Sequence, residues 1–216
     1  MRILVINPNT TAAMTAHVAS QLRLYLPDDT VILEKTATFG GPVIATQQAF
    51  ATGSEAASMA LADAAREGVV FDRVLLACFG DPGLEALRKL TPVPVTGLAE
   101  ACMRHAENTG LPYAVVTSGA GWKTMLNQRF AQWGAGRLYC GTHVISVTGM
   151  EVFSDPMGAM PAVLEGIAAA KRAGAQHIIL GGVVLAGYKA LMAQSSVQTQ
   201  GLADCVGIAA AALLQP

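Results

Sequence analysis

Short apolar runs alternate along the chain with longer stretches whose apolar residues recur at helical spacing. Residues 3–6, 31–35 and 74–77 predict strands, the last of them buried, and residues 11–24 and 47–66 predict helices between them. Strands separated by helices in this rhythm are typical of βαβ units around a mainly parallel sheet. The pattern therefore predicts an α/β fold. Further strands are expected at 113–116, 143–147 and 178–180, and further helices at 84–90, 98–108, 123–133, 161–173 and 203–214.

The second half of the chain repeats the first at a shift of 104 positions. VLLACFGDPGLEAL, which begins at Val74, aligns without a gap on IILGGVVLAGYKAL, which begins at Ile178. In the same register the triplet GLA at 97–99 meets a second GLA at 201–203, which argues for a duplication. The repeat predicts two pseudo-symmetric Rossmann-like lobes with mainly parallel sheets. The expected first lobe comprises 1–96 with the C-terminal segment 200–216, and the second comprises 97–199.

Four small polar or glycine-rich turns follow the predicted strands. In α/β sheets ligands bind beyond the carboxyl ends of strands, and a cleft between two lobes is a usual place for a small molecule. The turns at 7–10, 78–81, 117–121 and 181–183 would line such a cleft, and none of them contains Lys or Arg. Their lining therefore suits a carboxylate or an imide-like anion held by backbone N–H groups. No GxGxxG or P-loop motif supports a nucleotide cofactor.

The composition excludes several classes of protein. Of the 216 residues, 52% are hydrophobic and 13% charged, and the net charge is −1, which predicts an ordered globular protein. No basic cluster favours nucleic acid, and no apolar run approaches the roughly 18 residues that span a bilayer. The N-terminus reads as a strand and turn, which favours the cytoplasm. The apolar C-terminal helix, 208–214, suggests burial or a contact in a homo-oligomer.

The chain has four cysteines and no CxxC spacing. We therefore expect neither a metal site nor a disulfide framework, but free thiols in a reducing compartment. Cys78 differs from the others because it follows a predicted strand and begins a Gly-Asp-Pro turn. Taken alone, such a thiol is more often a small buried hydrophobe than a reactive group. The other three, which are expected to be core residues, are Cys102, Cys140 and Cys205.

Several motifs together resemble one protein family. INPNT at 6–10, ACFGDPGLEALR at 77–88, PVTGLAEA at 94–101 and AVVTSGAGW at 114–122 are similar to aspartate/glutamate/hydantoin racemases. The similarity is closest to the hydantoin and allantoin racemase branch and runs over nearly the whole chain. It implies a cofactor-independent site between two lobes. There, one cysteine from each lobe would flank the acidic carbon of a small-molecule substrate.

The resemblance also implies roles for individual residues. One thiolate removes a proton and the opposite thiol returns one on the other face, which requires a pKa near the working pH. Cys78 matches the first thiol, and the amides of Phe79 and Gly80 would lower its pKa from about 8.5. The other expected substrate-binding positions are polar residues and the backbone amides after each cysteine position: Asn9, Phe79, Gly80, Thr117, Ser118 and Val183.

Asp81 is a charged residue three positions beyond Cys78. Its carboxylate would raise the pKa of the thiol if it pointed inward. Its place just before the helix expected from Leu84 favours a different role. We expect it to cap that helix.

The chain departs from the family at the second thiol. The repeat aligns Cys78 with Gly182, where the two-cysteine racemases carry their second cysteine, and no other cysteine replaces it by position. We expect a racemase or epimerase that acts beside a carbonyl or carboxylate of a hydantoin, allantoin or amino-acid-like substrate. Water or another side chain would serve the second face. Two alternatives remain: a one-thiol decarboxylase or lyase, and a catalytically impaired or engineered member that binds a ligand without turnover.

Overall fold

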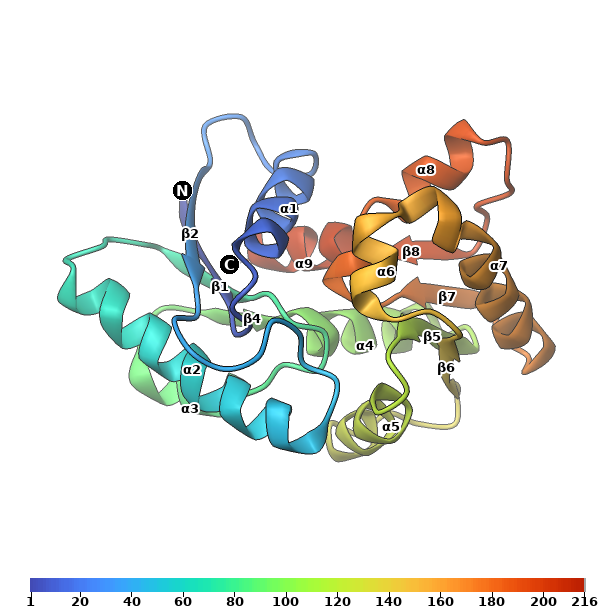
Figure 1. The fold of residues 1–216 in the computed structure, drawn as a ribbon, viewed down its shortest axis with the longest axis horizontal. Coiled ribbons are helices and arrows are strands. Elements are labelled where there is room, and N and C mark those ends of the chain that lie inside the picture. The colour runs from blue at the N-terminus through green and yellow to red at the C-terminus, as the bar shows by residue number, and fades with distance from the viewer. Residues whose placement is uncertain (216) are drawn as a thin grey trace. The chain divides into compact units, whose positions relative to one another are not determined.

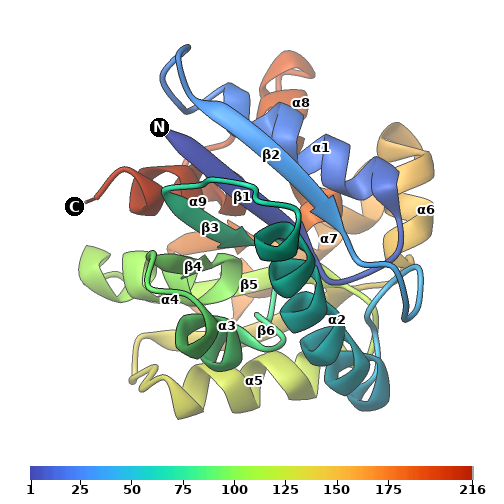
Figure 2. The same ribbon diagram turned by 90° about the vertical axis from the view of Figure 1, so that its left-hand side faces the viewer.

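A four-stranded parallel sheet in the order β2-β1-β3-β4 forms the first half of the computed structural model, which describes residues 1–215 (Figures 1 and 2). The central strands β1 (Arg2–Asn7) and β3 (Arg73–Leu76) are almost wholly buried after their first arginine, as the apolar runs at 3–6 and 74–76 require. β2 (Val31–Thr36) lies at one edge and keeps its side chains partly exposed. β4 (Val95–Gly97) forms the other edge.

Three helices connect these strands. α1 (Ala12–Arg23) and α2 (Gln47–Arg66) pack against β1 and β2, and α3 (Leu84–Leu90) packs against α2 and β4. The start of α2 is fixed by Thr46, whose hydroxyl accepts the backbone N–H of Ala49 at 3.1 Å. The bounds of α2 and α3 agree with the sequence prediction.

A second parallel sheet has the order β6-β5-β7-β8. It consists of β5 (Tyr113–Ser118), β6 (Tyr139–Ile145), β7 (His177–Leu180) and β8 (Leu202–Asp204). The order matches that of the first sheet when each strand is paired with the one four places later. The predicted α/β fold with two similar, mainly parallel sheets is confirmed.

Of the helices of the second half, those within residues 149–194 contribute to one apolar core. α7 (Pro156–Arg172) packs on β5 and β6, α5 (Trp122–Gln132) packs on β6, and α6 (Gly149–Ser154) packs on α7. α8 (Tyr188–Gln194) contacts β8 and follows a short 3-10 turn. Among the helices of residues 1–215, none is long and apolar enough to cross a bilayer.

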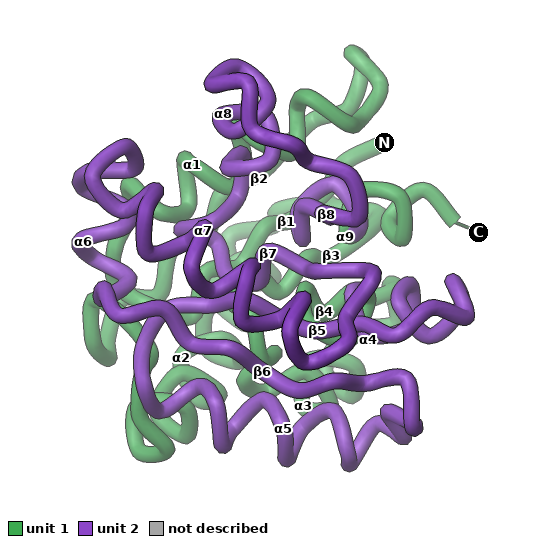
Figure 3. Tube along the Cα trace, turned by 90° about the vertical axis from the view of Figure 1, so that its right-hand side faces the viewer, with its two compact units in different colours: residues 1–101, 209–216 green, residues 102–208 purple. Residues whose placement is uncertain are grey.

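The chain divides into two compact units (Figure 3). One comprises Met1–Ala101 with the C-terminal segment from Ala209, and the other comprises Cys102–Ile208. The chain passes from one unit to the other within α4 (Leu98–Thr109) and within α9 (Cys205–Leu213). The sequence places these passages at about 96 and 199.

Several elements of the second unit differ from the sequence prediction. The last helix begins at Cys205 and not at 203, because residues 202–204 pair with β7 as a strand. The helix expected from Pro161 begins at Pro156, where Asp155 caps it, and Pro161 lies inside it. The strand expected at 143–147 is β6, which begins at Tyr139 and therefore contains Cys140.

The apolar C-terminal helix is largely explained within the chain. Val206, Ala209, Ala210 and Leu213 of α9 are all buried in the single protomer, and Leu214 beyond it is exposed. The apolar composition of this helix therefore needs no partner subunit. The homo-oligomer stays a prediction.

Candidate active site

Two corresponding turns leave β3 and β7. In the first unit Cys78 lies two residues beyond β3, and its carbonyl oxygen accepts the N–H of Asp81 at 3.0 Å. In the second unit Gly182 lies two residues beyond β7, and its carbonyl oxygen accepts the N–H of Leu185 at 2.9 Å. The repeat seen in the sequence is therefore also a repeat of turn hydrogen bonds.

In each sheet, part of the predicted site lies at the carboxyl ends of the two central strands. β1 and β3 pair in parallel, so Asn9 and Cys78, which follow them, lie at the same end of the first sheet. β5 and β7 pair in the same way, so Thr117 and Ser118 lie at the same end of the second sheet as Gly182. Within each unit, the structure places the predicted residues at the carboxyl ends of the strands, where α/β folds bind ligands.

Cys78 is buried, with 8% of the residue exposed. Burial, and after it the negative charge of Asp81, raises the pKa of its thiol well above the usual value. The expectation that the amides of Phe79 and Gly80 lower this pKa is therefore wrong. The N–H groups of these two residues donate to no acceptor within residues 1–215, so they can hydrogen-bond to an anionic oxygen of a ligand.

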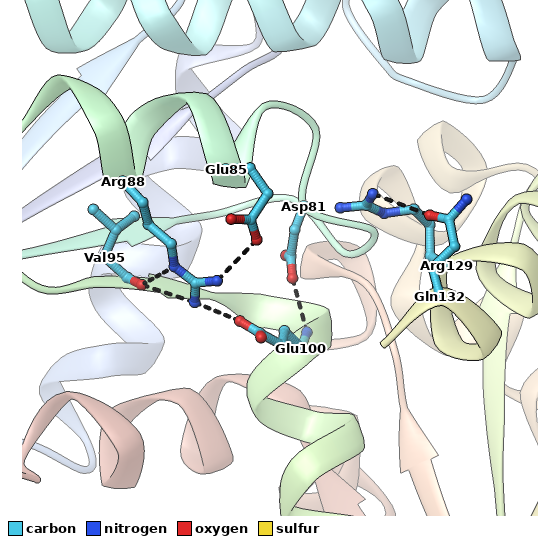
Figure 4. Close-up of polar contacts among 7 residues, drawn as sticks. All are labelled: Asp81, Glu85, Arg88, Val95, Glu100, Arg129 and Gln132. Carbon is cyan, nitrogen blue, oxygen red and sulfur yellow. Dashed lines mark hydrogen bonds and ion pairs between the residues drawn. The ribbon is translucent and has the colours of Figure 1, made fainter. Parts of the chain in front are cut away.

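Asp81 is fully buried and caps a helix other than the expected one. Its Oδ1 accepts the N–H of Ala99 at 3.0 Å and its Oδ2 accepts that of Glu100 at 2.7 Å, so it caps α4 (Figure 4). α3 instead begins after Gly83, whose φ of 83° suits glycine. Gly97 is required in the same place, because a Cβ there would overlap the Asp81 carboxylate.

An ion pair also holds the start of α4. Arg88 of α3 contacts the buried carboxylate of Glu100 at 2.5 Å and the exposed one of Glu85 at 3.0 Å (Figure 4). Its guanidinium also donates to the carbonyl oxygen of Val95 in β4, at 3.3 and 3.4 Å. One side chain thus ties α3, β4 and α4 together behind the turn that carries Cys78.

Asn9 lies in a buried polar network at the end of β1 and is 5% exposed. Its Oδ1 accepts hydrogen bonds from Asn7 Nδ2 and from the backbone N–H of Thr11, both at 2.9 Å. Its Nδ2 lies 3.7 Å from Met14 Sδ, a weak acceptor. Asn9 therefore has donor capacity left for a ligand.

Gly182 has a backbone conformation that differs from that of Cys78, its counterpart in the repeat. Its φ of 123° and ψ of 140° form a conformation that residues with a side chain rarely adopt, whereas Cys78 is not among the residues with positive φ. Space is not the obstacle, because among the described residues, chain neighbours aside, a Cβ at position 182 would meet within 4 Å only Thr117 Oγ1, at 3.5 Å. The two turns therefore differ in backbone conformation as well as in side chain.

Two hydroxyl groups lie at the end of β5. Thr117 and Ser118 are buried, yet their side chains hydrogen-bond to no other residue within 1–215. Val183, whose backbone amide the sequence also assigns to the site, begins the 3-10 turn after Gly182. The second unit thus offers hydroxyl and amide groups, with no charged side chain among them.

Cys205 contacts the Gly182 backbone, which the sequence does not reveal. It is the first residue of α9, and its buried Sγ lies 3.6 Å from the carbonyl oxygen of Gly182. Burial first and Asp204 second raise the pKa of this thiol. The alignment of the repeat could not find this contact, because Cys205 follows β8, a strand that the periodicity misses.

In the second unit, the carboxylate that joins the turn to the start of α9 stands at a different position of the repeat. Asp204 Oδ2 accepts the N–H of Gly187 at 2.6 Å, and Oδ1 accepts that of Val206 at 2.9 Å. In the repeat Asp204 corresponds to Glu100 and not to Asp81.

Among residues 1–215, no three His, Cys, Asp or Glu side chains are grouped so as to hold a metal ion.

Known proteins are similar to this chain in sequence and in fold. The model of the family described as Asp/Glu/Hydantoin racemase matches residues 3–213. A hydantoin racemase from Paenarthrobacter aurescens is 31% identical over 194 residues, which cover 87% of this chain and 80% of the relative. Allantoin racemase structures from Klebsiella pneumoniae and Pseudomonas fluorescens superpose with TM-scores of 0.85 and 0.84, each at 29% identity. They cover 99% of this chain, and 86% and 89% of their own chains are matched.

Proposed function

Because the chain belongs to the Asp/Glu/hydantoin racemase family and is an isomerase of the racemase type, we propose that Cys78 is its acid and base. The substrate would be a hydantoin, allantoin or amino-acid-like molecule with an acidic carbon beside a carbonyl or carboxylate. One observation carries the proposal: a buried thiol stands at the carboxyl end of β3, next to two backbone N–H groups without acceptors. No cofactor takes part in this mechanism.

The chemistry uses the first unit for proton transfer and charge stabilisation. Cys78 exchanges a proton with the acidic carbon, and the N–H groups of Phe79 and Gly80 stabilise the negative oxygen that forms beside it. Since the pKa of Cys78 is raised, the thiol is protonated at neutral pH and the thiolate form is scarce. We therefore expect the rate of proton abstraction to rise with pH above neutrality.

The second face of the substrate has no thiol at position 182. The nearest hydroxyl to a Cβ built there is that of Thr117, at 3.5 Å. A neutral hydroxyl is a weak base, so we propose that Thr117 and Ser118 hold the substrate and a water molecule, and that this water exchanges the proton on the second face. Val183 would contribute its backbone amide, and Asn9 an amide N–H.

Racemisation in D₂O tests the proposal. An L-5-monosubstituted hydantoin should lose optical rotation while its acidic hydrogen is replaced by deuterium. Cys78→Ala and Cys78→Ser should abolish both changes, whereas Cys140→Ser, which alters a half-buried thiol on β6, should leave them intact. Unchanged activity of the Cys78 variants would remove this thiol from the mechanism.

A one-thiol reaction is a second candidate, favoured by the glycine at position 182. If Cys78 alone transfers protons, deuterium enters the substrate from one face and optical rotation is kept. A malonate-like substrate would then lose carbon dioxide, and Cys78 would protonate the resulting carbanion. Deuterium exchange that outpaces the loss of rotation would support this reaction, and equal rates would exclude it.

A further inference from the structure

The Asn9 side chain is held in one orientation by a group of fixed polarity. The backbone N–H of Thr11 points at one end of the Asn9 amide, 2.9 Å away. A backbone N–H can only donate, so the atom that faces it must be Oδ1. The Nδ2 group therefore lies on the other side of the amide, where Met14 Sδ at 3.7 Å is its neighbour.

Asn7 is oriented by the same logic. Its Oδ1 accepts the backbone N–H of Asn9 at 3.1 Å, which turns its Nδ2 toward three acceptors. These are Asn9 Oδ1 at 2.9 Å, Thr15 Oγ1 at 3.0 Å and the carbonyl oxygen of Thr11 at 3.2 Å. Asn7 thus presents a donor to Asn9 and reinforces the orientation that the Thr11 backbone sets.

The network extends away from the site edge into the first unit. Thr15 of α1 is 1% exposed, and its Oγ1 lies 2.7 Å from Oγ1 of Thr36, the last residue of β2. Asn7, at the end of β1, is also 1% exposed. Buried polar groups with satisfied hydrogen bonds rigidify their surroundings. Three elements therefore support the Asn9 amide.

We propose that Asn7, supported by Thr15, is a positioning residue that commits Asn9 to donate a hydrogen bond through Nδ2 to an oxygen of the substrate. The inference rests on the proposed function, which places Asn9 at the substrate. It adds a polarity: the part of the substrate that meets Asn9 is a carbonyl or carboxylate oxygen and not a ring N–H. Negative charge grows on such an oxygen as the acidic carbon loses its proton, so a fixed donor assists the transition state more than the ground state.

Three substitutions test the positioning role in the racemisation of an L-5-monosubstituted hydantoin. Asn9→Asp replaces the donor with an acceptor and should reduce kcat by about 100-fold, the usual loss of an oxyanion donor. Asn7→Asp cannot donate to Asn9 Oδ1, and should reduce kcat about tenfold with KM changed by less than about threefold. Thr15→Val removes one of the three acceptors of Asn7 Nδ2 and should give a smaller loss in the same direction.

Ser20→Ala is the matched control, because Ser20 also lies on α1 but is exposed and donates its hydroxyl to the carbonyl oxygen of His17 in the same helix. Asn7→Asp and Thr15→Val proteins that keep their melting temperature but lose no more kcat than Ser20→Ala would overturn the inference. So would a loss confined to KM, since a positioned donor acts mainly in the transition state.

A measurement without turnover separates this inference from the proposed function. The side-chain amide signals of Asn7 and Asn9 can be assigned in ¹⁵N–¹H spectra from the Asn7→Asp and Asn9→Asp proteins. Asn7 should show slower hydrogen exchange than Asn9, and Thr15→Val should speed the exchange of Asn7. Equal exchange of both amides would refute the orientation even if the enzyme racemises hydantoins. Slow Asn7 exchange without hydantoin turnover would instead leave the orientation standing and reject the hydantoin as substrate.

Discussion

Gly182→Ala is expected to destabilise the protein through the backbone alone. At a φ of 123° the L configuration is unfavourable, so alanine must either remain strained or move the turn after β7. The side chain itself meets little resistance, because within residues 1–215, and apart from the chain neighbours, the new Cβ has one atom within 4 Å: Thr117 Oγ1, at an ordinary contact distance of 3.5 Å. The substitution therefore isolates the cost of the backbone conformation.

The size of this cost follows from the conformation. A residue with a side chain in such a sparsely populated region costs about 1–3 kcal/mol. For a chain of this length each kcal/mol lowers the melting temperature by about 2–4 °C. The midpoint of thermal unfolding should therefore fall by about 2–12 °C. Gly182→Cys should show the same fall, since the strain arises at the backbone and not at Sγ.

Gly136→Ala is a suitable control for this measurement. Gly136 is an exposed glycine of the same unit with no left-handed φ, and a Cβ there would lie 3.8 Å from Glu107 Oε2. Its melting temperature should stay unchanged or rise slightly, as for an unstrained glycine-to-alanine change. If Gly182→Ala melts together with Gly136→Ala, position 182 accepts a side chain freely. The chain would then lack its second thiol without any backbone adaptation.

Three further predictions concern charged or titratable groups. Asp81→Asn should lower the pKa of Cys78, because the substitution removes a negative charge but leaves the thiol buried. The rate of iodoacetamide alkylation as a function of pH, corrected for the other thiols with Cys78→Ser, measures this pKa, and an unchanged or higher value would contradict the prediction. Stability should fall as the pH drops from about 6.5 toward the lowered pKa of His177, because the unfolded chain takes up a proton that burial disfavours in the folded one. In His177→Gln the urea midpoint of unfolding should depend less on pH over this range. An equal dependence in both proteins would show that His177 is not its cause. Arg88→Met should lower the free energy of unfolding by about 1–3 kcal/mol, because the buried Glu100 carboxylate loses its guanidinium; a urea-unfolding loss below about 0.5 kcal/mol would show that the pair is weak.

The sequence predicts most of the fold where apolar periodicity is strong. The long helix at 47–66 and the short one at 84–90 appear with the expected bounds, because the helical spacing of their apolar residues is a local signal. β8 is missed because three residues are too few to show a period. Its existence depends on pairing with residues 178–180, which lie more than twenty positions earlier in the chain.

The sequence predicts which residue types form the candidate site, but not their pKa shifts, hydrogen-bond partners or backbone conformation. The motif around Cys78 is visible in the sequence, but the sign of its pKa shift depends on burial, which only the folded chain shows. Asp81 is identified as a cap, yet of the wrong helix, because β4 returns the start of α4 to the loop. The conformation of Gly182 has no sequence signal at all, since glycine is compatible with almost every φ.

The different positions of the two capping carboxylates limit how the repeats can be exchanged. In a chimera in which residues 77–83 are replaced by their counterparts 181–187, Leu185 would stand where Asp81 accepts the N–H groups of Ala99 and Glu100. The start of α4 would lose its acceptor, while Glu100 is longer than the Asp204 that serves the other repeat. A functional module for recombination is therefore the turn together with the start of α4 in the first unit, and the turn together with the start of α9 in the second.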